Sequence, residues 1–223
     1  MFDSLREVLA TRSLSWSEIV GIGRPGAPGL LLERLLGFDA SNRDGPDSKQ
    51  WQIKFHGGNA PLTLFHKTPK PKSIMHEMVK AFGWIDSNGR TSFRHTIYGK
   101  SSHGFRVIND GTRIVVQNTN YGELIQPYWT HDTIINAFAF KLRRLILVRG
   151  KNSRQNKSVN YESAKLYWEP SVTRLVDAIE SGIVAIDFDV RTNNGSGLRD
   201  HGTKFRIAIE NLDQFYEHSQ VFE

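Results

Sequence analysis

The sequence predicts a mixed α/β fold in which helices flank a central mixed sheet. Residues 51–55 alternate apolar and polar side chains with the two-residue period of a strand. Residues 73–82 space their apolar side chains as an amphipathic helix does. Strand and helix patterns are interspersed along all 223 residues, without an internal repeat. This length fits one large domain or two closely packed lobes, since single cores stop growing at roughly 250–300 residues.

The first half of the chain begins with helical patterns and continues into short strands. In chain order, we predict helices over 2–12 and 30–36, strands over 51–55 and 62–65, a helix over 73–82, and strands over 94–98, 105–108 and 112–117. The last two strands flank Asn109-Asp110-Gly111, which is a strong hairpin signal because asparagine and glycine tolerate the positive φ angles of tight β-turns.

The second half of the chain repeats this mixture. We predict a helix over 131–144, strands over 145–148 and 164–168, a helix over 171–182, strands over 183–190 and 203–209, and a short helix over 212–216. The basic polar run from Arg149 to Lys157 is the best candidate for a boundary between lobes. The expected lobes are therefore residues 1–150 and 151–223.

Composition excludes several classes of protein. The chain has no cysteine, which rules out disulfide scaffolds, thiolate zinc sites and cysteine nucleophiles. Subtracting 23 acidic from 29 basic residues gives a net charge of +6, which favours an anionic partner such as nucleic acid without deciding it. No apolar run approaches a membrane span, and the first residues lack the order of a signal peptide. We therefore expect a cytoplasmic protein with no membrane contact.

A constellation suited to phosphodiester hydrolysis surrounds the alternating strand at 51–55. Gln52 and Lys54 share one face of that strand, and Asp47 lies just before it, after Pro46. Such an arrangement offers two oxygen ligands for a metal ion beside an ammonium group, which metal-dependent hydrolysis of a phosphate requires. The alternative is an ordinary surface turn followed by a half-solvated strand, and spacing alone leaves both readings open.

Four blocks of the sequence resemble restriction endonucleases of the MvaI and BcnI type, which are relatives of the mismatch-repair nickase MutH. The blocks are residues 29–36 (GLLLERLL), 46–54 (PDSKQWQIK), 62–69 (LTLFHKTP) and 200–207 (DHGTKFRI). They span nearly the whole chain in the order found in that family. The resemblance implies the PD-(D/E)xK, or restriction endonuclease-like, fold. It also implies a catalytic lobe and a DNA-recognition lobe around a DNA cleft, which we assign to residues 1–150 and 151–223.

The resemblance implies a catalytic set of Asp47, Gln52, Lys54 and Glu33. Mg²⁺ is the implied cofactor, with Asp47 and Gln52 as its ligands. Gln52 departs from the family pattern, in which an acidic residue is usual. An amide oxygen can ligate Mg²⁺ but carries no charge, so the affinity for the metal should fall unless Glu33 compensates.

The resemblance also implies that the carboxy-terminal region reads DNA bases. Arginine pairs with guanine through two hydrogen bonds, and carboxylates accept from the amino group of cytosine. The candidate DNA-binding residues are Asp187, Asp189, Arg191, Arg199, Asp200, His201, Arg206, His66 and Lys67. The competing interpretation for the charged residues is a set of surface salt bridges, and for His66 a structural role.

The function that follows is that of a Type II restriction endonuclease with double-stranded DNA as its partner. Related enzymes act as monomers on short near-palindromes of the CCWGG or CCSGG kind, cut one strand and then the other, and accompany a cognate DNA methyltransferase. Two alternatives stay open: a MutH-like strand-specific repair nickase, and a DNA-binding module whose active site has decayed.

Overall fold

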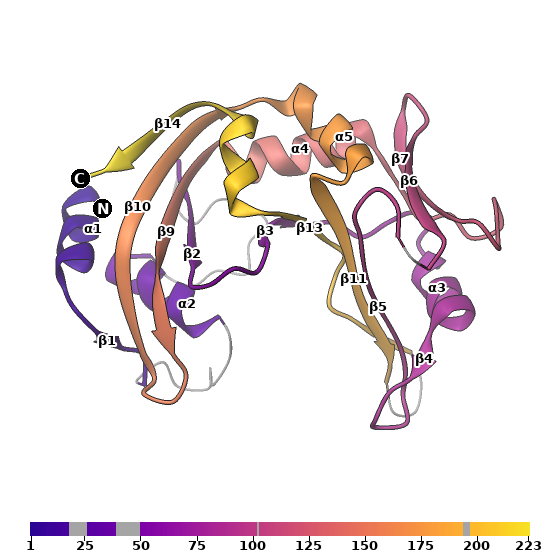
Figure 1. Cartoon of the computed structure of the whole chain (residues 1–223), viewed down its shortest axis with the longest axis horizontal. Coiled ribbons are helices and arrows are strands. Elements are labelled where there is room, and N and C mark those ends of the chain that lie inside the picture. Colours follow the sequence, from indigo (N-terminus) through magenta and orange to yellow (C-terminus); the bar gives the residue numbers. More distant parts are fainter. Residues whose placement is uncertain (18–25, 39–49, 102, 194–196) are drawn as a thin grey trace. The chain divides into compact units, whose positions relative to one another are not determined.

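Residues 1–17, 26–38, 50–101, 103–193 and 197–223 are described by the computed structural model (Figure 1). The chain divides into two units. Unit 1 comprises residues 1–60, 139–170 and 216–223, and unit 2 comprises residues 61–138 and 171–215. Residue 150, where the sequence suggested a boundary, lies within a strand of unit 1. The assignment of catalysis and recognition to separate lobes stays a prediction.

Unit 1 is a five-stranded mixed sheet with two helices. Its strands follow the order β1 (Leu14–Ser15), β10 (Ser158–Pro170), β9 (Arg144–Ser153) and β2 (Gln52–His56), with β14 (Tyr216–Phe222) also paired to β10. β2 runs parallel to β9, and the other pairs are antiparallel. The helices are α1 (Phe2–Ala10) and α2 (Ala27–Leu35). Figure 1 shows β9 and β10 as long adjacent strands.

The core of unit 1 confirms the alternation predicted for residues 51–55. Ile53 is buried with Ile146 and Val148 of β9 and with Leu32 of α2, and Trp51 and Phe55 pack against this cluster. Because side chains alternate along a strand, Gln52 and Lys54 lie on the opposite face of β2. The hydrophobic pattern therefore fixes which face presents the polar pair.

Unit 2 contains two antiparallel sheets. The larger follows the order β3 (Leu62–His66), β13 (Lys204–Ile207), β11 (Val184–Thr192), β5 (Thr91–Ile97) and β4 (Trp84–Ile85), with β12 (Leu198–Asp200) paired to β11. The smaller consists of β6 (Phe105–Asn109), β7 (Arg113–Asn118) and β8 (Tyr128–Thr130). Helices α3 (Ile74–Phe82) and α5 (Val172–Ser181) and a 3-10 helix, η1 (Ile209–Phe215), belong to this unit, and α4 (His131–Leu142) begins in it.

Aromatic residues form much of the core of unit 2. Phe65 and Phe205 stack with their ring centroids 4.7 Å apart, and Phe93 lies 5.5 Å from Phe188. These contacts join β3 to β13 and β5 to β11, so one face of the larger sheet is buried. The opposite face is left to polar side chains.

The predicted hairpin turn at 109–111 is confirmed. β6 and β7 pair across it, and Gly111 has a φ of 92°. The Asp110 carboxylate accepts hydrogen bonds from the backbone N–H groups of Thr112 and Arg113. These bonds and that from the Arg113 side chain favour the charged form and lower the pKa of Asp110.

Two expectations for the second half of the chain were wrong. The basic run at 149–157 is a β-hairpin, since β9 and β10 continue into it and pair as far as Ser153 and Ser158. The helix predicted over 212–216 is displaced to η1, and residues 216–222 form β14 instead. Most of β14 is exposed, so burial imposes no alternation that the sequence could reveal. None of the helices in the described ranges has the length and apolar content needed to cross a bilayer.

Candidate active site and nucleic-acid interface

β2 brings Gln52 and Lys54 together on one face of the sheet in unit 1. The Gln52 side chain is buried, with 4% of its residue surface exposed, and its Nε2 donates to the carbonyl oxygen of Ile53 at 3.3 Å. Lys54 is half-buried. The parallel register sets Gln52 beside Leu145 and Lys54 beside Leu147. A buried amide and a partly desolvated ammonium therefore share this face.

Glu33 lies on α2, which packs against β2. Its side chain is half-buried. The helix is tied to β10 by the Tyr161 hydroxyl, which donates to the carbonyl oxygen of Pro28 at 2.5 Å. Burial raises the pKa of Tyr161, so this hydroxyl keeps its proton. The helix that presents Glu33 is thus anchored to the sheet that presents Lys54.

Asp47, the charged metal ligand implied by the family resemblance, lies outside the described residues. In the part of the chain that is described, no three His, Cys, Asp or Glu side chains gather as a metal site would require. The implied ligands are nevertheless chemically suited to Mg²⁺, because carboxylate and amide oxygens are the donors that this ion takes in proteins. Gln52 is also buried, which limits competition from water.

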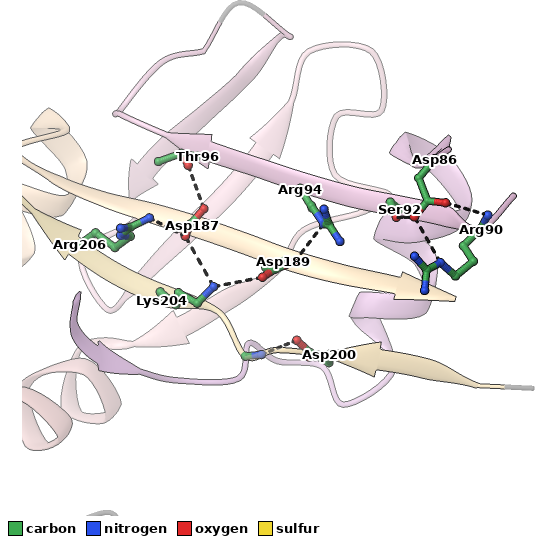
Figure 2. Close-up of polar contacts among 11 residues, drawn as sticks. Asp86, Arg90, Ser92, Arg94, Thr96, Asp187, Asp189, Asp200, Lys204 and Arg206 are labelled. Atoms are coloured by element: carbon green, nitrogen blue, oxygen red, sulfur yellow. Dashed lines mark hydrogen bonds and ion pairs between the residues drawn. The ribbon is translucent and has the colours of Figure 1, made fainter. Parts of the chain in front are cut away.

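In unit 2, the polar face of the larger sheet carries the first group of predicted DNA-binding residues. Along β11, Asp187, Asp189 and Arg191 alternate with side chains that are buried in the core. Their cross-strand neighbours on β5 are Thr96, Arg94 and Ser92, in that order, and Lys204 of β13 lies opposite Asp187. Figure 2 shows the resulting network of polar contacts.

Asp187 holds the guanidinium of Arg206. Its Oδ2 accepts from Nη1 of Arg206 at 3.2 Å and lies 3.8 Å from Nζ of Lys204, and its Oδ1 accepts from the Thr96 hydroxyl at 2.8 Å (Figure 2). Nη2 of Arg206 donates to the carbonyl oxygen of Pro61 at 2.9 Å. Arg206 is therefore held from two sides, which preorganises a group able to pair with a planar acceptor.

Asp189 lies between two cations that the sequence reading missed. Nε of Arg94 is 3.2 Å from its Oδ1, and Nζ of Lys204 is 3.3 Å from its Oδ2. These groups are partly exposed, so each ion pair contributes little to stability, about 0–1 kcal/mol. Residues 94 and 96 had the two-residue spacing of one strand face, but nothing in the sequence aligned that face with β11.

Positive charge accumulates at the far end of this face. Arg191 lies opposite Arg199 in the β11–β12 pair. Burial lowers the pKa of Arg191, and the neighbouring charges of Arg90, Arg199 and Arg94 lower it further. Asp86 partly offsets this charge, since its carboxylate lies 3.3 Å from Nε of Arg90 (Figure 2). The electrostatic potential around Arg191 therefore favours binding of an anion.

The remaining candidates cluster around β3, β12 and the segment that joins β12 to β13. Asp200 accepts from the N–H of Gly202 at 2.7 Å, and the N–H of His201 donates to the carbonyl oxygen of Asp189. His66 lies opposite Lys204 in the β3–β13 register. The backbone N–H of Lys67 donates to the carbonyl oxygen of Thr203, and its carbonyl oxygen accepts from the indole N–H of Trp129. The structure therefore brings all the candidates of unit 2 to one sheet and its loops.

A separate cavity in unit 2 involves none of the predicted site residues. It has a volume of about 560 Å³ and is lined by Phe82, Trp84, Phe93, Phe105, Tyr121 and the ring of His95, among others. Burial lowers the pKa of His95, and the charge of His103 lowers it further. Both effects favour a neutral imidazole.

Comparison with known proteins identifies the family. The model of the MvaI/BcnI restriction endonuclease family matches residues 8–216. The chain belongs to this family. It is accordingly a Type II site-specific deoxyribonuclease, as the resemblance in the sequence implied. Among curated proteins, none matches the chain.

Solved structures of MvaI share the fold. The complex of restriction endonuclease MvaI with its cognate DNA substrate is 23% identical, with a TM-score of 0.84, and the match covers 100% of this chain and 96% of that one. MvaI in the absence of DNA is 24% identical, with a TM-score of 0.59 and the same coverage. The predicted restriction endonuclease-like α/β fold is confirmed.

Proposed function

We propose that this member of the MvaI/BcnI family hydrolyses phosphodiester bonds of duplex DNA with Mg²⁺ at a short CCWGG- or CCSGG-like site. It would act as a monomer, cutting one strand at a time, in the cytoplasm and beside a cognate DNA methyltransferase that protects the host sequence. The observation that carries the proposal is that Gln52 and Lys54 lie on the same face of β2 in a chain of this family. The DNA complex of the related MvaI supports duplex DNA as the partner.

In the proposed mechanism, each catalytic residue has a distinct task. Asp47 and Gln52 would hold the ion through their oxygens, and Glu33 would add negative charge from α2. When bound, Mg²⁺ supplies electrostatic activation of the scissile phosphate. Lys54 would orient the attacking water, help to remove its proton and offset the charge that develops on the phosphate oxygens.

For recognition, we propose that Arg206 donates to a guanine in the major groove. Its anchoring by Asp187 and Pro61 supports this role, because little orientation remains to be fixed on binding. The other proposed DNA-binding residues are Asp187, Asp189, Arg191, Arg199, Asp200, His201, His66 and Lys67. Both oxygens of Asp187 already accept hydrogen bonds, so a cytosine amino group would have to share them.

Replacing Gln52 with glutamate is expected to retain cleavage and to lower the Mg²⁺ concentration that half-maximal cleavage requires. The substitution preserves the shape of the side chain and adds a full negative charge beside the ion. The gain should be modest while Glu33 is present and larger in a Glu33→Gln background. A Mg²⁺ titration of cleavage by the parent, the two single variants and the double variant measures this. A dead Gln52→Glu enzyme would show that the site needs the amide.

Supercoiled plasmid should pass through a nicked circle before it becomes linear. One chain carries a single Asp47/Gln52/Lys54 set, so a monomer must reorient to cut the second strand. Digestion of a sequenced plasmid with Mg²⁺, followed by mapping of the ends, tests the function and the site together. Direct linearisation at a rate rising with the square of enzyme concentration would indicate a cooperating dimer.

Cutting only with an added partner protein would favour the repair nickase, and binding without cutting would favour the decayed module.

A further inference from the structure

The face of unit 1 that carries Gln52 and Lys54 extends over three neighbouring strands. Cross-strand pairing defines three rows on this face, because residues opposite one another in a sheet point to the same side. The first row is Gln52, Leu145 and Tyr167; the second is Lys54, Leu147 and Lys165; the third is His56, Arg149 and Ser163.

Exposure increases from the first row to the third. Leu145 and Tyr167 are buried, with exposed fractions of 0% and 2%. In the second row Lys54 and Lys165 are half-buried, and in the third Arg149 and Ser163 are exposed. Lys54 therefore lies between the buried first row and the third row, which is the most exposed to solvent.

The second and third rows are positively charged. Lys54, Lys165 and Arg149 are basic, and no carboxylate occupies a position in any of the three rows. Within the described ranges, Arg149 makes no ion pair, whereas the next cation on β9, Lys151, lies 3.0 Å from Glu162. From strand spacing and rise, the Cβ atoms of Arg149 and Lys54 are roughly 8 Å apart. A long arginine side chain can thus reach a group adjacent to one bound at Lys54.

We propose that Arg149 binds the DNA backbone phosphate next to the scissile phosphate and so positions the cut strand at Lys54. This inference rests on the proposed function of the Lys54 face. Arg149 is a positioning residue in this scheme, since it touches a phosphate that does not react. Contacts to backbone phosphates fix register and orientation without reading sequence.

The test is a double-mutant cycle between the protein and the DNA. Single-turnover cleavage is measured for the parent and Arg149→Gln, on cognate oligonucleotides in which one phosphate at a time is replaced by a neutral methylphosphonate. Arg149→Gln should slow cleavage of ordinary DNA about 10-fold and reduce the salt dependence of binding by about one phosphate contact, a slope change near 0.9. At one phosphate adjacent to the cut, the two changes should not add, because each removes the same contact.

Matched variants separate this role from a general effect of charge or folding. Arg154→Gln removes an exposed cation from the turn of the same hairpin and should show additive effects at every phosphate. Arg149→Lys should restore part of the rate. Additivity of Arg149→Gln at every position, or behaviour equal to that of Arg154→Gln, would overturn this inference alone. A parent enzyme that cuts no DNA would overturn the proposed function and this inference with it.

Discussion

Lys54→Ala is expected to slow DNA cleavage by about a hundred- to a thousand-fold while leaving DNA binding nearly intact. The ammonium group is half-buried on β2, two residues beyond the proposed ligand Gln52. Removing one such preorganised donor typically costs this much, because the charge that develops in the transition state loses its partner. Asp47→Ala should have at least as large an effect, since it removes the charged ligand of the ion.

Single-turnover cleavage and a binding titration with Ca²⁺ in place of Mg²⁺ measure the two effects separately. Lys151→Ala is the control, because Lys151 lies on the adjacent strand β9 and pairs with Glu162 at the surface. Its rate should match that of the parent. Parental cleavage by Asp47→Ala and Lys54→Ala would remove the catalytic assignment altogether.

Arg206→Ala is expected to abolish site-selective cutting and to leave weak, sequence-independent binding. A bidentate contact between arginine and guanine contributes about 1–3 kcal/mol of discrimination against the wrong base. The Arg206 guanidinium is fixed by Asp187 and Pro61, so its loss removes an oriented donor rather than a mobile one. The fold should survive, because Asp187 keeps the Thr96 hydroxyl as a donor and Lys204 as a nearby cation.

The measurement compares binding of a cognate duplex with that of a duplex carrying one substituted base pair, together with mapping of plasmid ends. Arg174→Ala is a suitable control, since this exposed arginine lies on α5, outside the proposed DNA-binding set, and donates to the carbonyl of Gln214. If Arg206→Ala retained the parental ratio between the two duplexes, Arg206 would not be a base-reading residue.

The sequence predicted the local part of the candidate site better than its long-range part. The two-residue period of residues 51–55 predicted that Ile53 lies on one face of the strand and that Gln52 and Lys54 lie on the other. Burial of the apolar face determines which way the polar face points. The Asn109-Asp110-Gly111 turn was predicted equally well, since its conformation depends on neighbouring residues alone. Both features follow from interactions within a few residues of one another.

The partners of Asp187 and Asp189 could not be predicted in the same way. Arg94 meets Asp189 only because β5 and β11 pair in one particular register, across nearly a hundred residues of chain. Lys204 was present in a recognised block, but its contact with two carboxylates depends on the register of β13 as well. Arg149 fell in the run proposed as a boundary between lobes, because a polar, basic run carries no apolar alternation even when it forms a paired strand.

The interleaving of the two units has a consequence for the order of synthesis. The sheet that presents Lys54 takes β2 from the first quarter of the chain, β9 and β10 from the third, and β14 from residues 216–222. A nascent chain that has left the ribosome only as far as residue 150 still lacks β14 and β10, the strand to which β1, β9 and β14 all pair. Unit 1 can therefore complete its sheet only after unit 2 has been made, which delays a DNA-cutting activity until nearly all of the described chain has been translated.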